Sequence, residues 1–352
     1  MSPSAAEGGA RRSRRSFAGA RPVMEDVARR AGVSKQTVSR VLNDHPAVRA
    51  ETRAAVLEAM RELGYRPSRS ARSLASGRTR MLGVLSFDAG RYGPAAMLTA
   101  IDAAAREAGY LVSSIALGTA GRDTVVEAVD RLSAEGADGV IAIAPQRWVG
   151  RALAETALGT PVVVLDDAPA DGAPLVTGDS RSGARQATEH LLALGHRTVF
   201  QVAGPAGWTS ADQRLTAWRG ALEAAGAQVP EPLFGDWGAE SGYELGRRLA
   251  RSAEVTAVFA ANDQMALGVL HALHEAGRPV PDEVSVVGYD DIPEAAHFLP
   301  PLTTVRTDFA EIGTRSLRWL LHRIDGAEPP PSDALVPAEL VVRRSSGPPP
   351  GR

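Results

Sequence analysis

The spacing of apolar residues along the chain changes near residue 80. Between about residues 24 and 64, apolar side chains recur at helical spacing in three short segments, 24–31, 35–43 and 51–63. From residue 81 onward, short continuous apolar runs alternate with helical segments. The chain is therefore expected to hold a small helical domain followed by a larger α/β domain.

The larger domain has the pattern of a protein with parallel sheets. Apolar runs typical of buried strands cover residues 81–87, 112–117, 139–143, 161–165, 199–203, 257–260 and 284–288. Strands that alternate with helices form parallel sheets covered on both faces. The pattern allows one large sheet or two similar lobes. In either arrangement ligands gather beyond the carboxyl ends of the strands, so polar residues that follow strands are candidate ligand contacts.

The charge is divided between the same two parts. Residues 1–80 hold 17 Lys and Arg against 7 Asp and Glu, a net charge of +10, whereas residues 81–352 hold 22 against 34, a net charge of −12. A basic head suits a polyanionic partner such as DNA, because neutralising phosphates releases counterions. The alternative is a solvated basic tail.

The 352-residue chain is longer than a usual single domain and contains no cysteine. This composition excludes disulfides, thiolate metal sites and cysteine nucleophiles, and it fits a reducing cytoplasm. No apolar stretch approaches the roughly 18 residues of a membrane helix. Residues 13–17 resemble a twin-arginine export signal, but Arg21, Pro22 and Glu25 interrupt the apolar segment that should follow. We expect a cytoplasmic protein that needs no metal and no cofactor.

Residues 25–43 fit a helix-turn-helix. Gly32 permits a tight turn between two crossing helices, Ser34 can cap the second helix, and Val38 and Leu42 face inward. The outward positions of the second helix are polar: Lys35, Gln36, Ser39, Arg40 and Asn43. Such a recognition helix presents its side chains to the major groove, where Gln pairs with adenine and Arg or Lys with guanine. Periodicity alone equally allows a helical hairpin with a polar face.

The string over residues 26–43, together with Gly64-Tyr65-Arg66-Pro67, resembles the headpiece of the LacI family of bacterial repressors. The resemblance implies base contacts from Lys35, Gln36 and Arg40, and phosphate contacts mainly from Ser34, Thr37, Ser39 and Asn43. It also implies a hinge helix ordered on DNA, with Ala71 and Leu74 on one face and the leucine entering the minor groove. Ser68 stands where many relatives have Asn, and a plain flexible linker is the alternative.

The resemblance covers nearly all of residues 24–345 and is close to the lactose-type branch in three strings, residues 261–268, 285–291 and 300–305. It implies an α/β protein with an N-terminal helix-turn-helix headpiece and a two-lobed, periplasmic-binding-protein-like effector domain with parallel sheets. The expected parts are a disordered basic tail (1–22), the DNA-binding domain (23–66), the hinge helix (67–79), the effector-binding and dimerisation domain (80–345) and a disordered tail (346–352). The N-lobe would comprise 80–177 and 307–336, and the C-lobe 178–306 and 337–345.

A sugar site needs planar polar groups for hydroxyls and an aromatic face for the ring. Asp290 and Asn262 follow predicted strands, Arg214 lies near a helix start, and Trp237 can stack on a ring. By resemblance to lactose-type repressors, the pocket also contains Pro94, Met97, Asp166, Ser210 and Phe309. Taken singly, Asp290 could cap the next segment, Trp237 could be a core residue, and Arg214 could be an ion-pair partner on a solvated helix.

Three departures blur the identity of the ligand. Thr307 stands where lactose-type repressors have glutamine, Ile143 replaces an asparagine of that branch, and Arg91 brings a new charge to the loop over residues 88–94. The resemblance thus suggests a galactoside-like sugar as the effector without identifying it. By linkage, the ligand would favour one closure angle of the lobes and release a palindromic operator. The chain ends in proline-rich residues instead of a leucine heptad, so we expect a homodimer.

An enzyme and a secreted sugar-binding protein are the alternatives. The sequence lacks a dinucleotide fingerprint, a phosphate loop and a nucleophile elbow, and His271 and His274 share a helix face without a carboxylate–histidine pattern. Asp290 and Asp291 are adjacent in a strand and point to opposite sides, which is poor geometry for glycoside hydrolysis. The basic head argues against a secreted binding protein. We expect a DNA-binding repressor, with operator DNA, a sugar and a second copy of the chain as partners.

Overall fold

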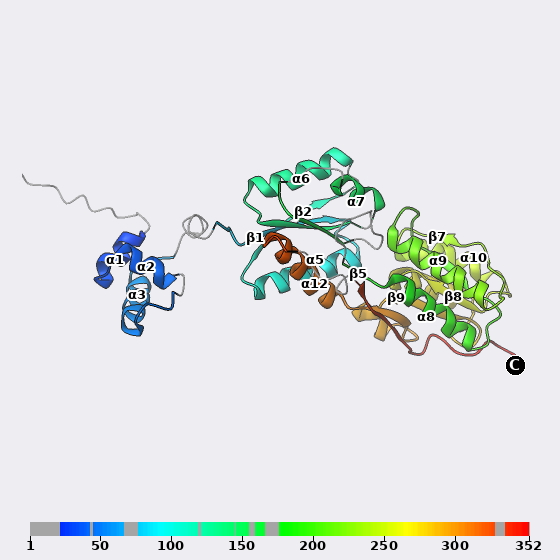
Figure 1. Ribbon diagram of the computed structural model, residues 1–352. Helices are drawn as coiled ribbons and strands as arrows, with labels where there is room; N and C mark the ends of the chain where they lie inside the picture. Colours follow the sequence, from blue (N-terminus) through cyan, green and yellow to red (C-terminus); the bar gives the residue numbers. More distant parts are fainter. Residues whose placement is uncertain are drawn as a thin grey trace, which may run out of the picture. The chain divides into compact units, whose positions relative to one another are not determined.

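The computed structural model describes residues 22–42, 45–66, 77–118, 121–144, 146–154, 159–165, 176–327 and 335–351. They belong to two compact units that divide between Thr79 and Arg80 (Figure 1), where the apolar spacing changes. Most of the two segments predicted as a basic tail (1–22) and a hinge helix (67–79) lies outside the described residues.

The first unit consists of three helices: α1 (Met24–Ala31), α2 (Lys35–Leu42) and α3 (Ala50–Leu63). Gly32 ends α1 with a left-handed φ of 67°, which a glycine adopts without steric cost. The helices pack on a small core that includes Val27, Val38, Val41 and Val56. Val41 is the fully inward residue at the end of α2, and the predicted Leu42 is only partly buried.

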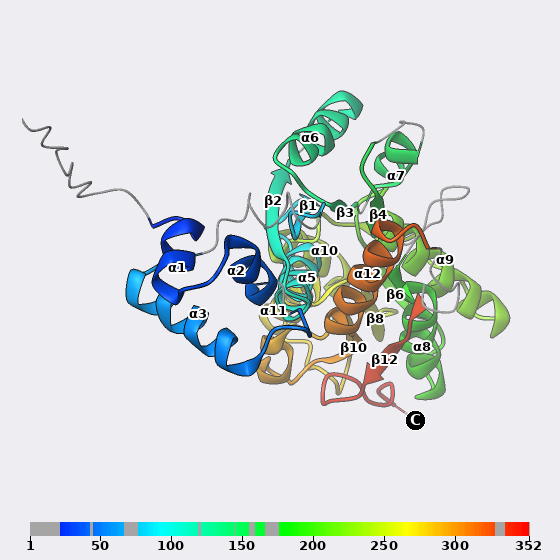
Figure 2. The ribbon, with the colours of Figure 1, turned by 60° about the vertical axis from the view of Figure 1, so that its left-hand side comes forward.

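The N-lobe of the second unit is a four-stranded parallel sheet of order β2-β1-β3-β4. Its strands are β1 (Met81–Phe87), β2 (Leu111–Leu117), β3 (Gly139–Ile143) and β4 (Val162–Leu165). One face is covered by α5 (Tyr92–Glu107) and α12 (Phe309–Ile324), the other by α6 (Arg122–Ala134) and α7 (Arg147–Ala154) (Figure 1). Helices α5 and α12 lie side by side (Figure 2), and a Cβ on Gly313 would lie 2.7 Å from the carbonyl carbon of Ala100.

The C-lobe is a six-stranded sheet of order β12-β10-β9-β8-β6-β7, in which only β12 is antiparallel to its neighbour. Its strands are β6 (Phe200–Ala203), β7 (Leu233–Phe234), β8 (Ala257–Ala260), β9 (Ser285–Asp290), β10 (Thr303–Thr307) and β12 (Ala338–Val341). One face packs on α8 (Ser180–Ala193) and α9 (Thr209–Ala224), the other on α10 (Ala239–Ala250) and α11 (Asp263–Glu275). A short 3₁₀ helix, η1 (Pro293–His297), follows β9.

Helices α10 and α11 are in direct backbone contact because glycines line their interface. A Cβ on Gly268 of α11 would lie 2.0 Å from the carbonyl oxygen of Ala239, and one on Gly242 of α10 would lie 2.2 Å from the carbonyl oxygen of Met265. Side chains at these positions would push the helices apart.

The chain passes between the two sheets at three places. It leaves the N-lobe through β5 (Thr177–Gly178), returns from β10 into α12, and leaves again through β11 (Leu335–Val336), which pairs with β5. The described strands thus form two lobes, the second of the two arrangements that the strand pattern allowed. None of the described helices has the length and apolar composition to cross a membrane.

The predicted disorder of residues 346–352 is wrong for the start of that segment. The Ser346 hydroxyl lies 3.0 Å from Nε2 of His190, and the Gly347 amide donates to Oγ of Ser285 at 3.0 Å. Serine and glycine indicated a solvated tail by composition, but these bonds join groups far apart in sequence, which no local pattern reveals.

Candidate functional site

A pocket lies in the second unit, with walls from both lobes. Its cavity is about 210 Å³, many times the space of one ordered water, so it is large enough for an organic ligand. All predicted effector contacts that the structure describes line it: Pro94, Met97, Ser210, Arg214, Trp237, Asn262, Asp290 and Phe309. The ninth, Asp166, lies outside the described residues.

A buried ion pair forms the polar end of the pocket. Arg214 on α9 and Asp290 at the end of β9 are each 8% exposed, and Nη2 lies 3.4 Å from Oδ1. The guanidinium also donates to the Ala261 carbonyl and stacks on the ring of Tyr289 at 3.6 Å. Arg214 therefore does form an ion pair, but the pair is buried in the pocket wall and does not lie on the solvated helix face considered as the alternative. A paired guanidinium and carboxylate present donors and acceptors side by side, as neighbouring sugar hydroxyls require.

Asp290 and Trp237 have positive φ angles, a backbone conformation that residues other than glycine rarely adopt. Their φ angles are 106° and 73°, and that of Asp291 is 52°. Non-glycine residues in this region cost free energy and cluster at ligand sites, where surrounding structure holds them. The strain therefore marks the same end of the pocket as the ion pair.

Asn262 joins two walls of the pocket. Its Oδ1 accepts from the Met265 amide at 3.0 Å, which caps the start of α11. Its Nδ2 donates to the Trp237 carbonyl at 3.0 Å and to Oε1 of Gln264 at 2.8 Å. The side chain thus fixes the loop that carries Trp237 while it lines the cavity.

Aromatic rings enter the pocket from both lobes. Trp237 meets Trp208 edge to face with centroids 5.7 Å apart, and Tyr92 meets Phe309 likewise at 5.8 Å. Burial, and then the charge of Asp290, raises the pKa of Tyr92. Sequence reasoning missed Trp208 and Tyr92, although Trp208 follows strand β6 and so satisfied the rule used for other candidates.

The three departures from the lactose-type pattern, Arg91, Ile143 and Thr307, all line the pocket. Arg91 comes from the N-lobe and lies near Asp236 of the C-lobe. The pKa of Asp236 is lowered first by the Ser241 hydroxyl, then by the Gly238 amide, with a contribution from Arg91. These positions are candidates for what distinguishes the ligand of this chain.

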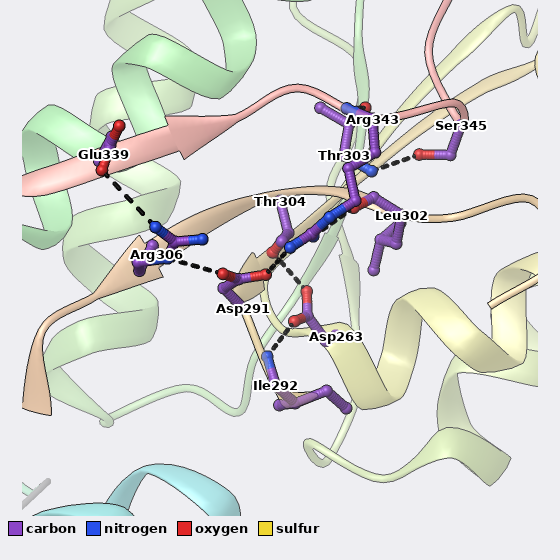
Figure 3. A network of polar contacts seen from close by, with 10 residues as sticks. All are labelled: Asp263, Asp291, Ile292, Leu302, Thr303, Thr304, Arg306, Glu339, Arg343 and Ser345. Carbon is purple, nitrogen blue, oxygen red and sulfur yellow. Dashed lines mark hydrogen bonds and ion pairs between the residues drawn. The ribbon is translucent and has the colours of Figure 1, made fainter. Parts of the chain in front are cut away.

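Asp291 directly follows β9 and is not among the residues that line the pocket. It accepts from Nε of Arg306 at 2.8 Å and from Nη2 of Arg343 at 2.6 Å (Figure 3). Arg306 lies on β10 and Arg343 follows β12, so one carboxylate ties three segments together. The strand end that carries Asp290 is thereby fixed.

A second carboxylate supports the same region from within. Asp263 is fully buried, and it accepts from Oγ1 of Thr304 at 2.5 Å and from the Ile292 amide at 2.9 Å (Figure 3). Burial, followed by the charge of Asp290, raises its pKa well above the usual range. Asp263 thus positions the residues that follow Asp290 and does not itself line the pocket.

The outward face of α2 carries the predicted DNA contacts. Ser34, Lys35, Gln36 and Arg40 are exposed, and Thr37 and Ser39 are partly buried. The Ser34 hydroxyl accepts from the Thr37 amide at 3.1 Å, so Ser34 caps α2 as expected. Asn43, Ala71 and Leu74 lie outside the described residues.

A helix-turn-helix unit followed by a two-lobed unit with a ligand pocket defines a ligand-responsive regulatory protein. Residues 23–68 match the model of bacterial regulatory proteins, lacI family, and residues 188–346 match the periplasmic binding protein-like domain. The lactose operon repressor of Escherichia coli is 35% identical over 323 residues, 91% of this chain and 89% of the relative.

Solved structures agree over the same length. A lac repressor dimer bound to operator and the anti-inducer ONPF aligns with a TM-score of 0.81 at 34% identity, covering 93% of this chain and 99% of that chain. A complex of the transcriptional regulator CelR with cellobiose aligns with a TM-score of 0.67 at 34% identity, covering 92% and 100%. The chain belongs to the lacI family of bacterial regulatory proteins. The resemblance that the headpiece and strand-end strings indicated is therefore confirmed.

Proposed function

We propose that this chain is a transcriptional repressor that binds a palindromic operator as a homodimer and is released by a saccharide in its interlobe pocket. One observation carries the proposal: a buried guanidinium–carboxylate pair, Arg214 and Asp290, lies beside aromatic rings in a pocket walled by both lobes. Polar pairs for hydroxyls and rings for the apolar sugar face are what a saccharide needs. The helix-turn-helix of the same chain would bind the operator that the saccharide releases.

The pocket is built for binding. Asp290 is the one carboxylate among the described lining residues, and its ion pair with Arg214 suits hydroxyl recognition better than paired acid and base catalysis. We therefore infer no catalytic activity. Relatives have been solved with cellobiose and with ONPF. The effector of this chain is accordingly sought first among galactosides and glucosides.

Because both lobes line the pocket, a ligand there interacts differently with open and closed lobe arrangements, which is the requirement for a shift in conformation. Gln146 of the N-lobe and Trp208 of the C-lobe also form an isolated antiparallel bridge, so the lobes touch beside the cavity.

The proposed roles in DNA binding are base contacts by Lys35, Gln36 and Arg40, phosphate contacts by Ser34, Thr37, Ser39 and Asn43, and a hinge with Ala71 and Leu74.

The test is fluorescence anisotropy of the full chain on a labelled operator selected from a random duplex pool, at fixed salt, titrated with lactose, cellobiose, ribose and related sugars. Tight binding to one palindrome that a sugar abolishes is expected. Tight binding that no sugar changes would refute the pocket assignment and leave the DNA function intact. Binding without sequence preference would refute the repressor function.

A further inference from the structure

One ion pair joins the two helices of the DNA-reading unit at their exposed first turns. Nζ of Lys35, the only lysine in the chain, lies 2.8 Å from Oε2 of Glu25. Lys35 begins α2 and Glu25 lies in the first turn of α1, and both side chains are 58% exposed. The hydrogen bond and charge of Lys35 lower the pKa of Glu25, so the carboxylate stays ionised.

Such a pair adds little to folding. Exposed ion pairs contribute about 0–1 kcal/mol, because water screens the charges and two long side chains lose freedom. Other acids in this unit pair with arginines: the partly buried Asp26 with Arg29, and the exposed Glu62 with Arg30. The Glu25 pair differs because its cation, Lys35, is one of the residues proposed to contact a base.

A carboxylate at this place has a specific consequence for DNA recognition. Successive bases on a strand are about 3.4 Å apart along the helix axis, so a carboxylate 2.8 Å from Nζ stays within about one base-pair step of whatever Lys35 contacts. Unpaired, it would repel the phosphates. In the major groove a carboxylate characteristically accepts from the N4 amino group of cytosine, while lysine donates to O6 and N7 of guanine.

We propose that Glu25 and Lys35 act as one unit that reads guanine and cytosine at one base pair, or at two neighbouring ones, in each operator half-site. Lys35 donates to guanine, and Glu25 accepts from cytosine N4 while holding the ammonium group in place. This inference rests on the proposed DNA-binding function and adds a specificity-determining residue, Glu25, that lies outside the recognition helix.

The test measures base preference in the full chain. Operators selected from the random pool are substituted one base pair at a time, and Kd is measured by anisotropy at fixed salt for wild type, Glu25→Gln, Lys35→Met and the double variant. Glu58→Gln is the matched control, because Glu58 pairs with Arg61 on α3 and is likewise exposed. It removes the same charge from the same unit.

In Glu25→Gln, the ratio of Kd values that expresses the preference for cytosine should fall about tenfold at one position per half-site. Lys35→Met should lose the preference for guanine at the same or the next base pair, and the double variant should lose both preferences. Glu58→Gln should leave every preference unchanged. If Glu25→Gln instead tightens binding to all sequences alike, Glu25 only neutralises Lys35 and the inference is wrong. A pool from which no sequence is enriched would refute the DNA function itself, and with it this inference.

Discussion

Replacing Arg214 by methionine separates the structural role of the buried ion pair from its role in ligand binding. The substitution keeps an unbranched apolar stem but leaves Asp290, which is 8% exposed, without its cation. Breaking a buried pair by removing one partner costs about 3–5 kcal/mol, because the remaining charge stays buried without compensation. The double variant Arg214→Met with Asp290→Asn removes that charge. Its free energy of unfolding should exceed that of Arg214→Met by at least about 2 kcal/mol.

Urea unfolding followed by tryptophan fluorescence measures these changes in the second unit alone, because all five tryptophans follow residue 80. Operator release by lactose or cellobiose is then measured for the wild type and both variants. Neither variant should respond to the sugar that releases the wild type. Failure of Asp290→Asn to recover stability would refute the uncompensated-charge argument, and a double variant that still releases DNA would remove Arg214 from the effector site.

Three further predictions concern single positions. Burial raises the pKa of Asp263, so the native state holds an extra proton between the ordinary aspartate pKa and the raised one, and stability falls as pH rises through that window. Asp263→Asn should lose this part of the pH dependence when urea midpoints at about pH 5 and about pH 8 are compared, and an unchanged dependence would contradict the argument. Gly268→Ala should destabilise by about 2–3 kcal/mol in urea because its Cβ would lie 2.0 Å from a backbone oxygen of α10, whereas Gly220→Ala, with open space around it, should not destabilise. Ser34→Ala removes the cap of α2 and should speed amide exchange in that helix about fivefold, while Ser34→Asn, which can still cap, should not.

Elements with strong apolar periodicity could be predicted to within a few residues. The strand expected over 139–143 is β3, and the helix expected over 24–31 is α1. Deviations occur where side-chain context extends an element. Helix α5 begins at Tyr92, two residues before Pro94, because a proline in the first helical turn lacks only an amide that would be unpaired anyway.

The supporting contacts of the site could not be predicted, because they join residues distant in sequence. From the sequence, Asp263 is indistinguishable from an exposed aspartate in the first turn of a helix. In the structure it is fully buried and accepts a hydrogen bond from Thr304, 41 positions later. Trp208 follows a strand and so was within reach of the rule for candidates, but only the fold places its ring against Trp237 in the pocket. Local pattern identifies candidates that follow strands, and tertiary packing decides which of them meet.

The position of Asp290 relative to the lobe crossings explains how a ligand in the pocket can act on the angle between the two lobes. Strand β10 lies beside β9, which carries Asp290, and runs directly into α12 of the other lobe. Thr307 and Phe309 line the pocket on that crossing, and Arg306 just before it is anchored to Asp291. A ligand that contacts both Asp290 and Phe309 therefore bridges the two ends of one crossing. Its binding free energy depends on the angle between the lobes, and that dependence is the amount by which it can shift the lobe equilibrium.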